Sequence, residues 1–386
     1  MIKSTLSSIA AGCLLALAAI SPSIHATPIG FTPGSNGAPF ISAPLNAPNA
    51  FNVPTLVIRK WIAQGPMLVL GNAQYRNVPA FFKCSREASA SGNEEKAFNL
   101  LLRAEKSLRG AAAMGKEFIA RPMYAFKPPQ GGYCTVYTYG GDMTLDALLR
   151  RQTPANKLRY LPVILDQMLQ GLAYMHRAGV AHNDIKPQNV MVTVARTGGV
   201  KITIIDYDLG LEIKTPVIHI NKPITVRGQT MGFRAPEGQI PNASIDGRKS
   251  DAWSVGATIY NLLTVTDTLG FDYSKKRDQW MSYIAAATPG SLPAPAASRS
   301  PARSPTLPRV SPITPANYRT FGAYPAPTTP QGAAFAQLLF KMDVLLTRDP
   351  RYRPNPQEML AGRTKYNNRA TVAAGVVNWY RGVPKI

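Results

Sequence analysis

The sequence contains few cysteines, few histidines and few acidic residues. Among 386 residues, three are cysteine, four are histidine and 21 are Asp or Glu, against 43 Lys or Arg. Because the cysteines and histidines are scattered, none of the closely spaced sets that hold zinc occurs. The net charge of +22 suits an acidic protein, a nucleic acid or an acidic membrane. The basic residues are dispersed without a nucleic-acid motif, so we expect a solvated cationic surface and no nucleic-acid partner.

The N-terminal apolar run, residues 6–20, is too short to cross a bilayer comfortably, which takes about 20 residues. It follows Lys3 and precedes a short polar stretch ending at Ala26, which is the layout of a secretory signal peptide. We expect residues 1–26 to be removed, leaving a secreted or periplasmic protein without a stable membrane anchor. A membrane anchor and a lipoprotein site at Cys13 are weaker alternatives.

Removal of that segment leaves two cysteines, Cys84 and Cys134, in a chain destined for an oxidising compartment. A disulfide requires suitable backbone geometry, which the sequence does not specify. A disulfide and two separate buried thiols therefore both remain open.

Three segments have the composition of flexible chain. Residues 27–53 are rich in Pro, Gly, Asn, Ala and Ser and are predicted to be a flexible leader. Residues 288–330 contain eleven prolines and four arginines but no acidic residue, which predicts a disordered insertion. Residues 366–386 form a C-terminal tail.

Residues 182–189 place a carboxylate, an ammonium group and a carboxamide close together. Asp184 can accept the proton of an attacking hydroxyl, Lys186 can neutralise charge on a phosphoryl group, and Asn189 can hold a magnesium ion. This combination favours phosphoryl transfer.

A second carboxylate follows a predicted hairpin. Two apolar runs, residues 190–194 and 200–205, flank a turn containing Gly198 and Gly199 and lead to Asp206. A carboxylate at the end of a buried strand is costly without a cation or a hydrogen-bond donor. Asp206 is therefore a candidate magnesium ligand.

The order and spacing of these residues resemble the catalytic loop of the protein kinase superfamily, and the Lys186-Pro187 pair resembles its Ser/Thr branch. Three later segments agree with this resemblance: 230–237, which ends in Ala-Pro-Glu; 251–256; and 345–354. The resemblance implies an α+β, bilobal kinase-like fold with a small β-rich N-lobe at 54–139 and a larger helical C-lobe at 140–365. It also implies an ion pair between the two residues Glu237 and Arg353.

The resemblance assigns roles to the catalytic residues. Asp184 is the expected base, Lys186 steadies the γ-phosphate of ATP, and Thr230 contacts the catalytic loop. Asn189 and Asp206 are the expected Mg²⁺ ligands. Cys84 and Cys134 fall on strands that are neighbours in the family, which allows them to pair.

The nucleotide site is expected on the N-lobe and hinge. Two positions compete for the loop over the phosphates, residues 62–67 and 70–75, and strand spacing favours the first, with fewer glycines than the family has. Glu94 and Glu95 are interpreted as helix caps rather than partners of the lysine. The expected nucleotide-binding residues are Lys83, its partner Glu105, Gly65, Leu70, the hinge residues Thr138 and Tyr139 after the gatekeeper Tyr137, and Met191.

Periodicity predicts the surrounding elements. A capping-box pattern at residues 91–94 opens a predicted helix to about residue 108. A Leu and Met stripe predicts a buried helix at 158–178. Strands are expected at 55–62, 67–70, 78–83, 118–126 and 133–138.

Two residues depart from the kinase pattern. Asn183 replaces the arginine that precedes the catalytic aspartate, so no activation-loop phosphate should be needed. Asp208 replaces the glycine of the magnesium motif. Asp208 and the missing loop glycines leave a pseudokinase that binds partners as the chief alternative to the expected enzyme. A small-molecule kinase is a third option, which Lys186 and the segment 230–237 disfavour. The expected enzyme is a monomeric, exported Ser/Thr kinase whose protein substrate, acidic or host-derived, lies in another cell.

Overall fold

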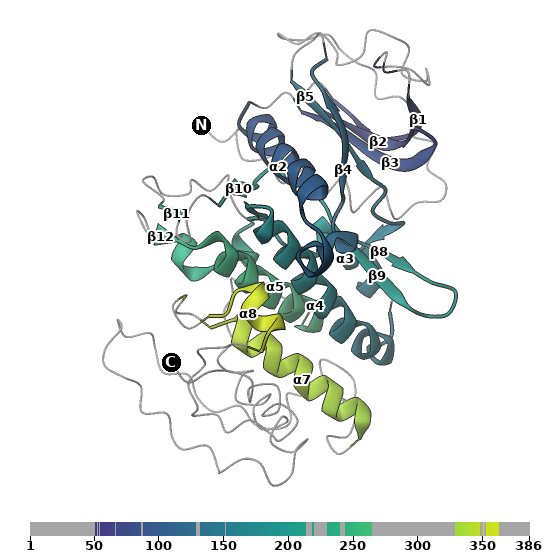
Figure 1. Ribbon diagram of the computed structural model, residues 1–386. Coiled ribbons are helices and arrows are strands. Elements are labelled where there is room, and N and C mark those ends of the chain that lie inside the picture. Colours follow the sequence, from purple (N-terminus) through teal and green to yellow (C-terminus); the bar gives the residue numbers. More distant parts are fainter. Residues whose placement is uncertain are drawn as a thin grey trace, which may run out of the picture. The chain divides into compact units, whose positions relative to one another are not determined.

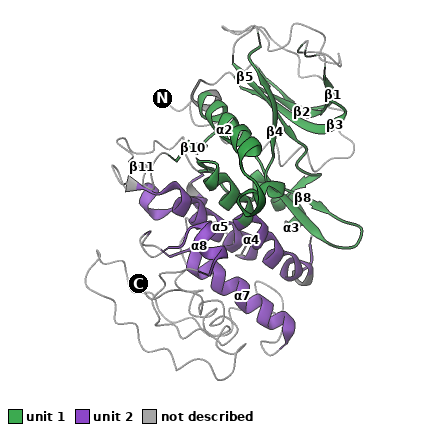
Figure 2. Cartoon of the chain, viewed as in Figure 1, with its two compact units in different colours: residues 1–151, 170–216 green, residues 152–169, 217–386 purple. Residues whose placement is uncertain are grey.

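The computed structural model describes residues 51, 53, 55–65, 67–85, 88–128, 132–150, 152–213, 218–219, 230–239, 244–264, 329–347, 350 and 353–362. The predicted signal peptide, the C-terminal tail, and most of the predicted leader and insertion lie outside these residues. The chain forms two compact units, one of residues 1–151 and 170–216, the other of residues 152–169 and 217–386 (Figure 2). The predicted lobe boundary at residues 139–140 stays a prediction.

The first unit contains a five-stranded antiparallel sheet in the order β1-β2-β3-β5-β4 (Figure 1). The helix α2, Ala88–Ser107, contacts β3, β4 and β5. The strands are β1 Leu56–Gln64, β2 Leu68–Tyr75, β3 Val78–Ser85, β4 Pro122–Phe126 and β5 Tyr133–Thr138.

Strand β2 is longer than the sequence suggests, because Gly71 and Asn72 lie inside the strand rather than in a turn. A Cβ atom at Gly71 would lie 2.5 Å from the Lys60 carbonyl oxygen, so this glycine permits the close approach of β1. The turn to β3 is made by Arg76 and Asn77, whose φ angles of 50° and 64° are those of a tight hairpin turn.

One face of this sheet carries a hydrophobic core. Phe82, Cys84, Cys134 and Val136 are fully buried there. The end of the predicted leader belongs to this core: the ring of Phe51 lies 5.5 Å from that of Phe82, and Val53 also contacts the cluster. The prediction of flexible chain up to residue 53 is therefore wrong at its end, because these apolar side chains bury surface on the sheet.

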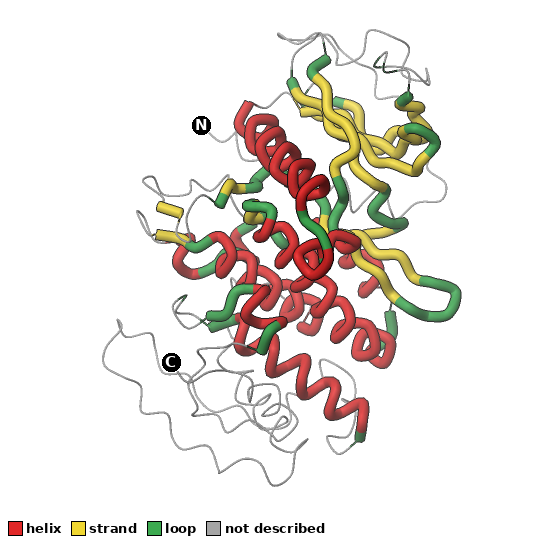
Figure 3. Tube along the Cα trace, viewed as in Figure 1, coloured by secondary structure: helices red, strands yellow, loops and turns green. Residues whose placement is uncertain are grey.

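The first unit also contains short strands, helices and the loops between them, and Figure 3 draws strands in yellow, helices in red and loops in green. The long helix α4, Pro154–Arg177, is divided between the two units, and its predicted stripe of Leu161, Leu165, Met168, Leu172 and Met175 is fully buried, which confirms the core role of the stripe. The other elements of this unit are η1 Gly110–Ala113, η2 Lys116–Phe118, β6 Met143–Thr144, α3 Leu145–Arg150, part of α4 Pro154–Arg177, β7 Val180–Ala181, η3 Pro187–Asn189, β8 Val190–Val194, β9 Val200–Ile204 and β10 Leu211–Glu212.

The second unit is built on the helix α5, Gly247–Thr264, which contacts α7, Pro330–Leu345, and α8, Pro356–Leu360. The Thr329 side chain caps α7, so the predicted insertion ends two residues too late. None of the described helices is both long and apolar enough to cross a membrane. The shorter elements are β11 Ile218–His219, η4 Met231–Phe233, η5 Pro236–Gln239 and β12 Ser244–Ile245.

The predicted ion pair of the second unit is present. Arg353 donates two hydrogen bonds to Glu237, at 2.6 Å and 3.0 Å, and its side chain is fully buried. The guanidinium also donates to the carbonyl oxygens of Thr347 and Lys249, at 2.8 Å and 3.0 Å, and lies 5.0 Å above the ring of Trp253. Each of the three guanidinium nitrogens therefore donates at least one hydrogen bond.

Cys84 and Cys134 form a disulfide between the neighbouring strands β3 and β5. The pair lies next to the Lys83 and Thr135 pair in the strand register, so it fixes the strands that carry the lysine. The structure thus decides between the two alternatives left open by the sequence.

Replacing Cys84 and Cys134 together with alanine should lower the free energy of unfolding by about 2 to 4 kcal/mol, because the bond closes a long loop in the unfolded chain. Denaturant unfolding measures the loss. A reductant should destabilise the wild type alone; equal stability of both proteins, with two free thiols in the wild type, would contradict the assignment.

Candidate active site

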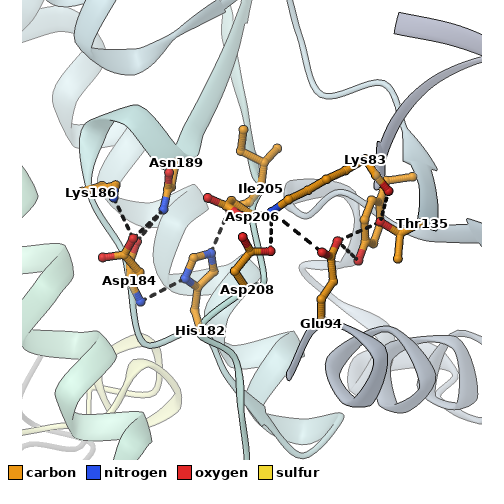
Figure 4. Close-up of polar contacts among 11 residues, drawn as sticks. Lys83, Glu94, Thr135, His182, Asp184, Lys186, Asn189, Ile205, Asp206 and Asp208 are labelled. Carbon is orange, nitrogen blue, oxygen red and sulfur yellow. Dashed lines mark hydrogen bonds and ion pairs between the residues drawn. The ribbon is translucent and has the colours of Figure 1, made fainter. Parts of the chain in front are cut away.

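The predicted catalytic loop brings its polar side chains into direct contact (Figure 4). Lys186 Nζ lies 2.7 Å from Asp184 Oδ2. The Asn189 amide nitrogen donates to the same oxygen at 3.1 Å and to the Asp184 carbonyl oxygen at 2.9 Å. The Asp184 carboxylate is therefore held by two donors from its own loop, with a fixed orientation.

His182 joins this loop to the segment that carries Asp206. Its Nδ1 accepts from the Asp184 amide at 3.2 Å, so its Nε2 carries the proton and donates to the Ile205 carbonyl oxygen at 2.9 Å. The Ile205 amide donates to the Asn189 carbonyl oxygen at 3.0 Å. Asn183, between His182 and Asp184, has φ 65°, a left-handed conformation that asparagine tolerates better than most residues.

Three carboxyl groups surround Lys83. Its Nζ lies 2.7 Å from Asp206 Oδ1 and 3.8 Å from Glu94 Oε2, and it donates a hydrogen bond to Asp208 Oδ1. The side chain of Lys83 is only 8% exposed. Figure 4 shows Asp206, Asp208 and Glu94 converging on the end of this lysine.

These contacts set the protonation states of the group. Burial alone would lower the pKa of Lys83, but the charges of Asp206, Asp208 and Glu94 outweigh it and raise that pKa well above its usual value. Burial would raise the pKa of Asp206, but the Lys83 charge and hydrogen bond lower it to about 2. Burial and the neighbouring Asp206 charge raise the pKa of Asp208 well above its usual value.

The partner predicted for Lys83, Glu105, is a wrong assignment. Glu105 accepts hydrogen bonds from Arg121 at 3.1 Å and from the Tyr174 hydroxyl at 3.4 Å. The residue beside Lys83 is Glu94. Helix α2 begins at Ala88 rather than Ser91, so Glu94 lies in its second turn and faces inward instead of capping the first turn.

Two hydroxyl groups of β5 hold Glu94 and were not identified from the sequence. The Thr135 hydroxyl donates to Glu94 Oε1 at 2.7 Å, and the Tyr137 hydroxyl donates to the same oxygen at 3.2 Å. Thr135 lies opposite Lys83 in the strand register, and Tyr137, two residues further on, lies on the same face of β5. Only the strand register places them beside the helix glutamate, so no linear spacing could have indicated their role.

Tyr207, between Asp206 and Asp208, is a second anchor. It is fully buried, and its hydroxyl lies 2.9 Å from the Ala120 carbonyl oxygen and 3.1 Å from that of Ile204. Phenylalanine would lack these bonds. The backbone of the segment that carries the two aspartates is therefore fixed at its centre.

The expected nucleotide-binding positions are distributed as follows. Gly65 lies in the β1–β2 turn, as the favoured loop position requires, and its amide donates to the Leu68 carbonyl oxygen at 2.8 Å. Leu70 lies opposite Lys83 in the strand register and is buried. Met191 lies in β8 and packs against Gly140. A Cβ atom added at Gly140 would lie 3.3 Å from Met191 Cγ.

The expected hinge follows β5. The amides of Thr138 and Tyr139 donate to the carbonyl oxygens of Arg121 and Pro79, at 2.9 Å and 3.2 Å. These two residues can therefore contact a nucleotide only through their carbonyl groups or side chains. Thr230 lies in the second unit, where its carbonyl oxygen accepts from the Phe233 amide at 2.9 Å, and its expected contact with the catalytic loop stays a prediction.

The donor set fits a magnesium ion. Asn189 Oδ1 is buried and has no hydrogen-bond partner, as an oxygen ligand without its cation would be. Asp206 supplies an ionised carboxylate. Among the described residues, no group of three or more His, Cys, Asp or Glu could hold a metal. Magnesium does not require one, because it is usually bound by one or two carboxylates together with substrate phosphates.

Asp184, Lys186, Asn189, Asp206 and Lys83 are the types of side chain that phosphoryl transfer uses. A model of the protein kinase domain matches residues 83–363, more than half of the chain. The chain therefore belongs to the protein kinase domain family, and the predicted fold class is confirmed. The match begins at Lys83, so it does not include β1, β2 and the turn at Gly65.

Curated relatives are protein kinases from several kingdoms. CBL-interacting protein kinase 4 of Oryza sativa is 35% identical over 141 residues, which are 36% of this chain and 28% of the relative. A probable serine/threonine-protein kinase of Streptomyces coelicolor is 40% identical over 98 residues, 25% of this chain and 14% of the relative. Sperm motility kinase 2B of Mus musculus is 34% identical over 101 residues, 26% of this chain and 19% of the relative. The chain spans less than half of the length of each of these three relatives.

Proposed function

We propose that the protein is an ATP-dependent protein serine/threonine kinase. The observation that carries this proposal is the contact of Asp184 with Lys186 and Asn189, beside the ion pair of Lys83 with Asp206. These five side chains supply a base, two cations and two oxygen ligands, which is the set that phosphoryl transfer from ATP uses.

Each residue has a defined task. Asp184 accepts the proton of the attacking serine or threonine hydroxyl, and Lys186 neutralises charge on the transferred group. Asn189 and Asp206 hold magnesium, which, when bound, neutralises the phosphate oxygens. Lys83 orients the α- and β-phosphates.

We propose that activity does not depend on a phosphate on the activation segment. The position before Asp184 is Asn183, which carries no positive charge to pair with such a phosphate. The backbone at residue 183 is left-handed, a conformation that asparagine adopts more easily than most residues, and this favours asparagine at the position.

We also propose that the protein is exported and that it acts on a protein in another cell. The Cys84–Cys134 disulfide supports passage through an oxidising compartment, because such bonds are rare in proteins that stay in the cytosol. Extracellular spaces hold little ATP, so delivery into a second cell would supply the nucleotide. The net charge of +22 favours an acidic protein substrate there.

Purified full-length protein incubated with labelled ATP, magnesium and generic protein substrates should transfer label to serine and threonine. Analysis of the labelled residues distinguishes this result from labelling of tyrosine. Label found only in small metabolites, or nucleotide binding without transfer, would contradict the proposal. Export is tested separately: the first 26 residues fused to a reporter enzyme that is active only outside the cytosol should give activity.

The two glutamates of α2 should have different effects on catalysis. Glu94→Ala should lower kcat/KM about 10- to 100-fold, because Lys83 then loses a neighbour that helps to fix it. Glu105→Ala should change kcat/KM less than about threefold, because Glu105 contacts Arg121 and Tyr174 instead. Steady-state kinetics with varied ATP measure both. The reverse order would show that Glu105 is the functional partner.

A further inference from the structure

Asp208 stands where the kinase pattern has glycine, and the proposed function gives it no task. The Asp208 carboxyl group contacts Lys83, the lysine expected to bind the nucleotide. Lys83 Nζ donates one hydrogen bond to Asp208 and another to Asp206, the second at 2.7 Å. Glu94, the other acidic neighbour, is 3.8 Å away. The Asp208 carboxyl group is therefore a closer partner of the lysine nitrogen than Glu94 is.

Asp206 and Glu94 have other binding partners when Lys83 turns to phosphate, whereas the hydrogen bond and the ion pair of the Asp208 side chain both go to Lys83. Asp206 is expected to bind magnesium. Glu94 Oε1 already accepts from the hydroxyls of Thr135 and Tyr137, which keep this glutamate in place. The contact between Lys83 and Asp208 must therefore be given up, at least in part, for the lysine to contact phosphate.

The backbone around Asp208 is held in place on both sides. The residue before it, Tyr207, is fixed by hydrogen bonds from its hydroxyl to the carbonyl oxygens of Ala120 and Ile204. Two residues after it, the Gly210 amide donates to the Tyr207 carbonyl oxygen at 2.9 Å, which closes a tight turn around Asp208. The side chain is thus presented to Lys83 by a fixed backbone.

We propose that Asp208 is a positioning residue that competes with the phosphates of ATP for Lys83 and so weakens nucleotide binding in the resting protein. This inference rests on the proposed function and names a control of the same site. Either protonation state of Asp208 offers an oxygen acceptor to the lysine, so the competition does not depend on its titration. Release of Lys83 is then a step that a substrate or partner can favour.

The test uses the full chain and isothermal titration calorimetry with magnesium and a non-hydrolysable ATP analogue. Asp208→Ala and Asp208→Gly should each bind this complex at least about tenfold more tightly than wild type, because hydrogen bonds to charged groups contribute on this scale. Asp166→Ala removes a carboxylate that pairs with Lys341 in the second unit and should leave the affinity unchanged. In turnover, the two Asp208 variants should lower KM for ATP while kcat changes less than about twofold.

A double-mutant cycle with Lys83→Met locates the effect. In the Lys83→Met background, Asp208→Ala should change affinity much less than it does in wild type, since the competition acts through the lysine. Equal or weaker binding by both folded Asp208 variants would overturn the inference and leave the proposed function intact. An undiminished gain in the Lys83→Met background would also overturn it. Absence of nucleotide binding by wild type and every variant would overturn the proposed function as well.

Discussion

Replacement of Asp184 by asparagine should lower the rate of phosphoryl transfer about a thousandfold. Asparagine keeps the size of the side chain and can still accept from Lys186, but it cannot take up the proton of the attacking hydroxyl. Contributions of a positioned general base are typically on the order of 10² to 10⁴ in rate. Transfer of label from ATP to a protein substrate, measured in single turnover, reports this step.

The matched control is Asp166→Asn, which removes a carboxylate that pairs with Lys341 outside the catalytic loop. It should leave the rate within about twofold of wild type. Both proteins should keep their affinity for the nucleotide within a small factor, because Asp184 is not a proposed magnesium ligand. An Asp184→Asn protein that transfers phosphate at the wild-type rate would remove Asp184 from its assigned role.

Arg353→Met should lower the free energy of unfolding by about 3 to 5 kcal/mol. The substitution leaves the buried carboxylate of Glu237 without its two hydrogen bonds and also removes the bonds to Thr347 and Lys249. A buried charge that loses its partner carries the full cost of its removal from water. Denaturant unfolding measures the loss.

Two comparison proteins separate this effect from the loss of any ion pair. Lys341→Met breaks the partly exposed pair with Asp166 and should cost less than about 1 kcal/mol. The double variant Arg353→Met with Glu237→Leu removes both buried charges and should be more stable than Arg353→Met alone. If all three variants unfold at the same denaturant concentration as wild type, the pair is not a structural element of the second unit.

The catalytic loop could be predicted from the sequence because its contacts are local. Asp184, Lys186 and Asn189 lie within six residues of one another, so the short loop itself fixes their contacts. The hairpin that leads to Asp206 could also be predicted from the sequence, since two apolar runs flank a glycine-containing turn. The Glu237–Arg353 pair is distant in sequence and was found only through the resemblance to kinases.

The environment of Lys83 was predicted less well, because it depends on where a helix begins. The capping-box pattern at Ser91 predicts a helix start three residues after the true one, and a helix that begins there makes Glu94 a cap. The spacing of Glu94 from the buried Ala97, Phe98 and Leu101 was the overlooked signal, since these positions share one helix face.

Other features depend on contacts between elements that are distant in the sequence, so they could not be predicted from it. Thr135 and Tyr137 reach Glu94 across elements that the sequence does not relate to each other. Phe51 looked like part of a flexible leader because its neighbours are Pro, Asn and Ala, yet its ring joins the sheet core. Asp208 departs visibly from the kinase pattern in the sequence, but its contact with Lys83 follows only from the folded structure.

The central claim is that Asn189 and Asp206 hold a metal-bound nucleotide beside Asp184 and Lys83. A crystal structure of the full chain with magnesium and a non-hydrolysable ATP analogue tests it directly. The account predicts an ion about 2.1 Å from Asn189 Oδ1 and from an Asp206 oxygen, with Lys83 turned to the phosphates. A nucleotide bound elsewhere, with Asn189 Oδ1 still without a partner and Lys83 still on its carboxylates, would contradict it.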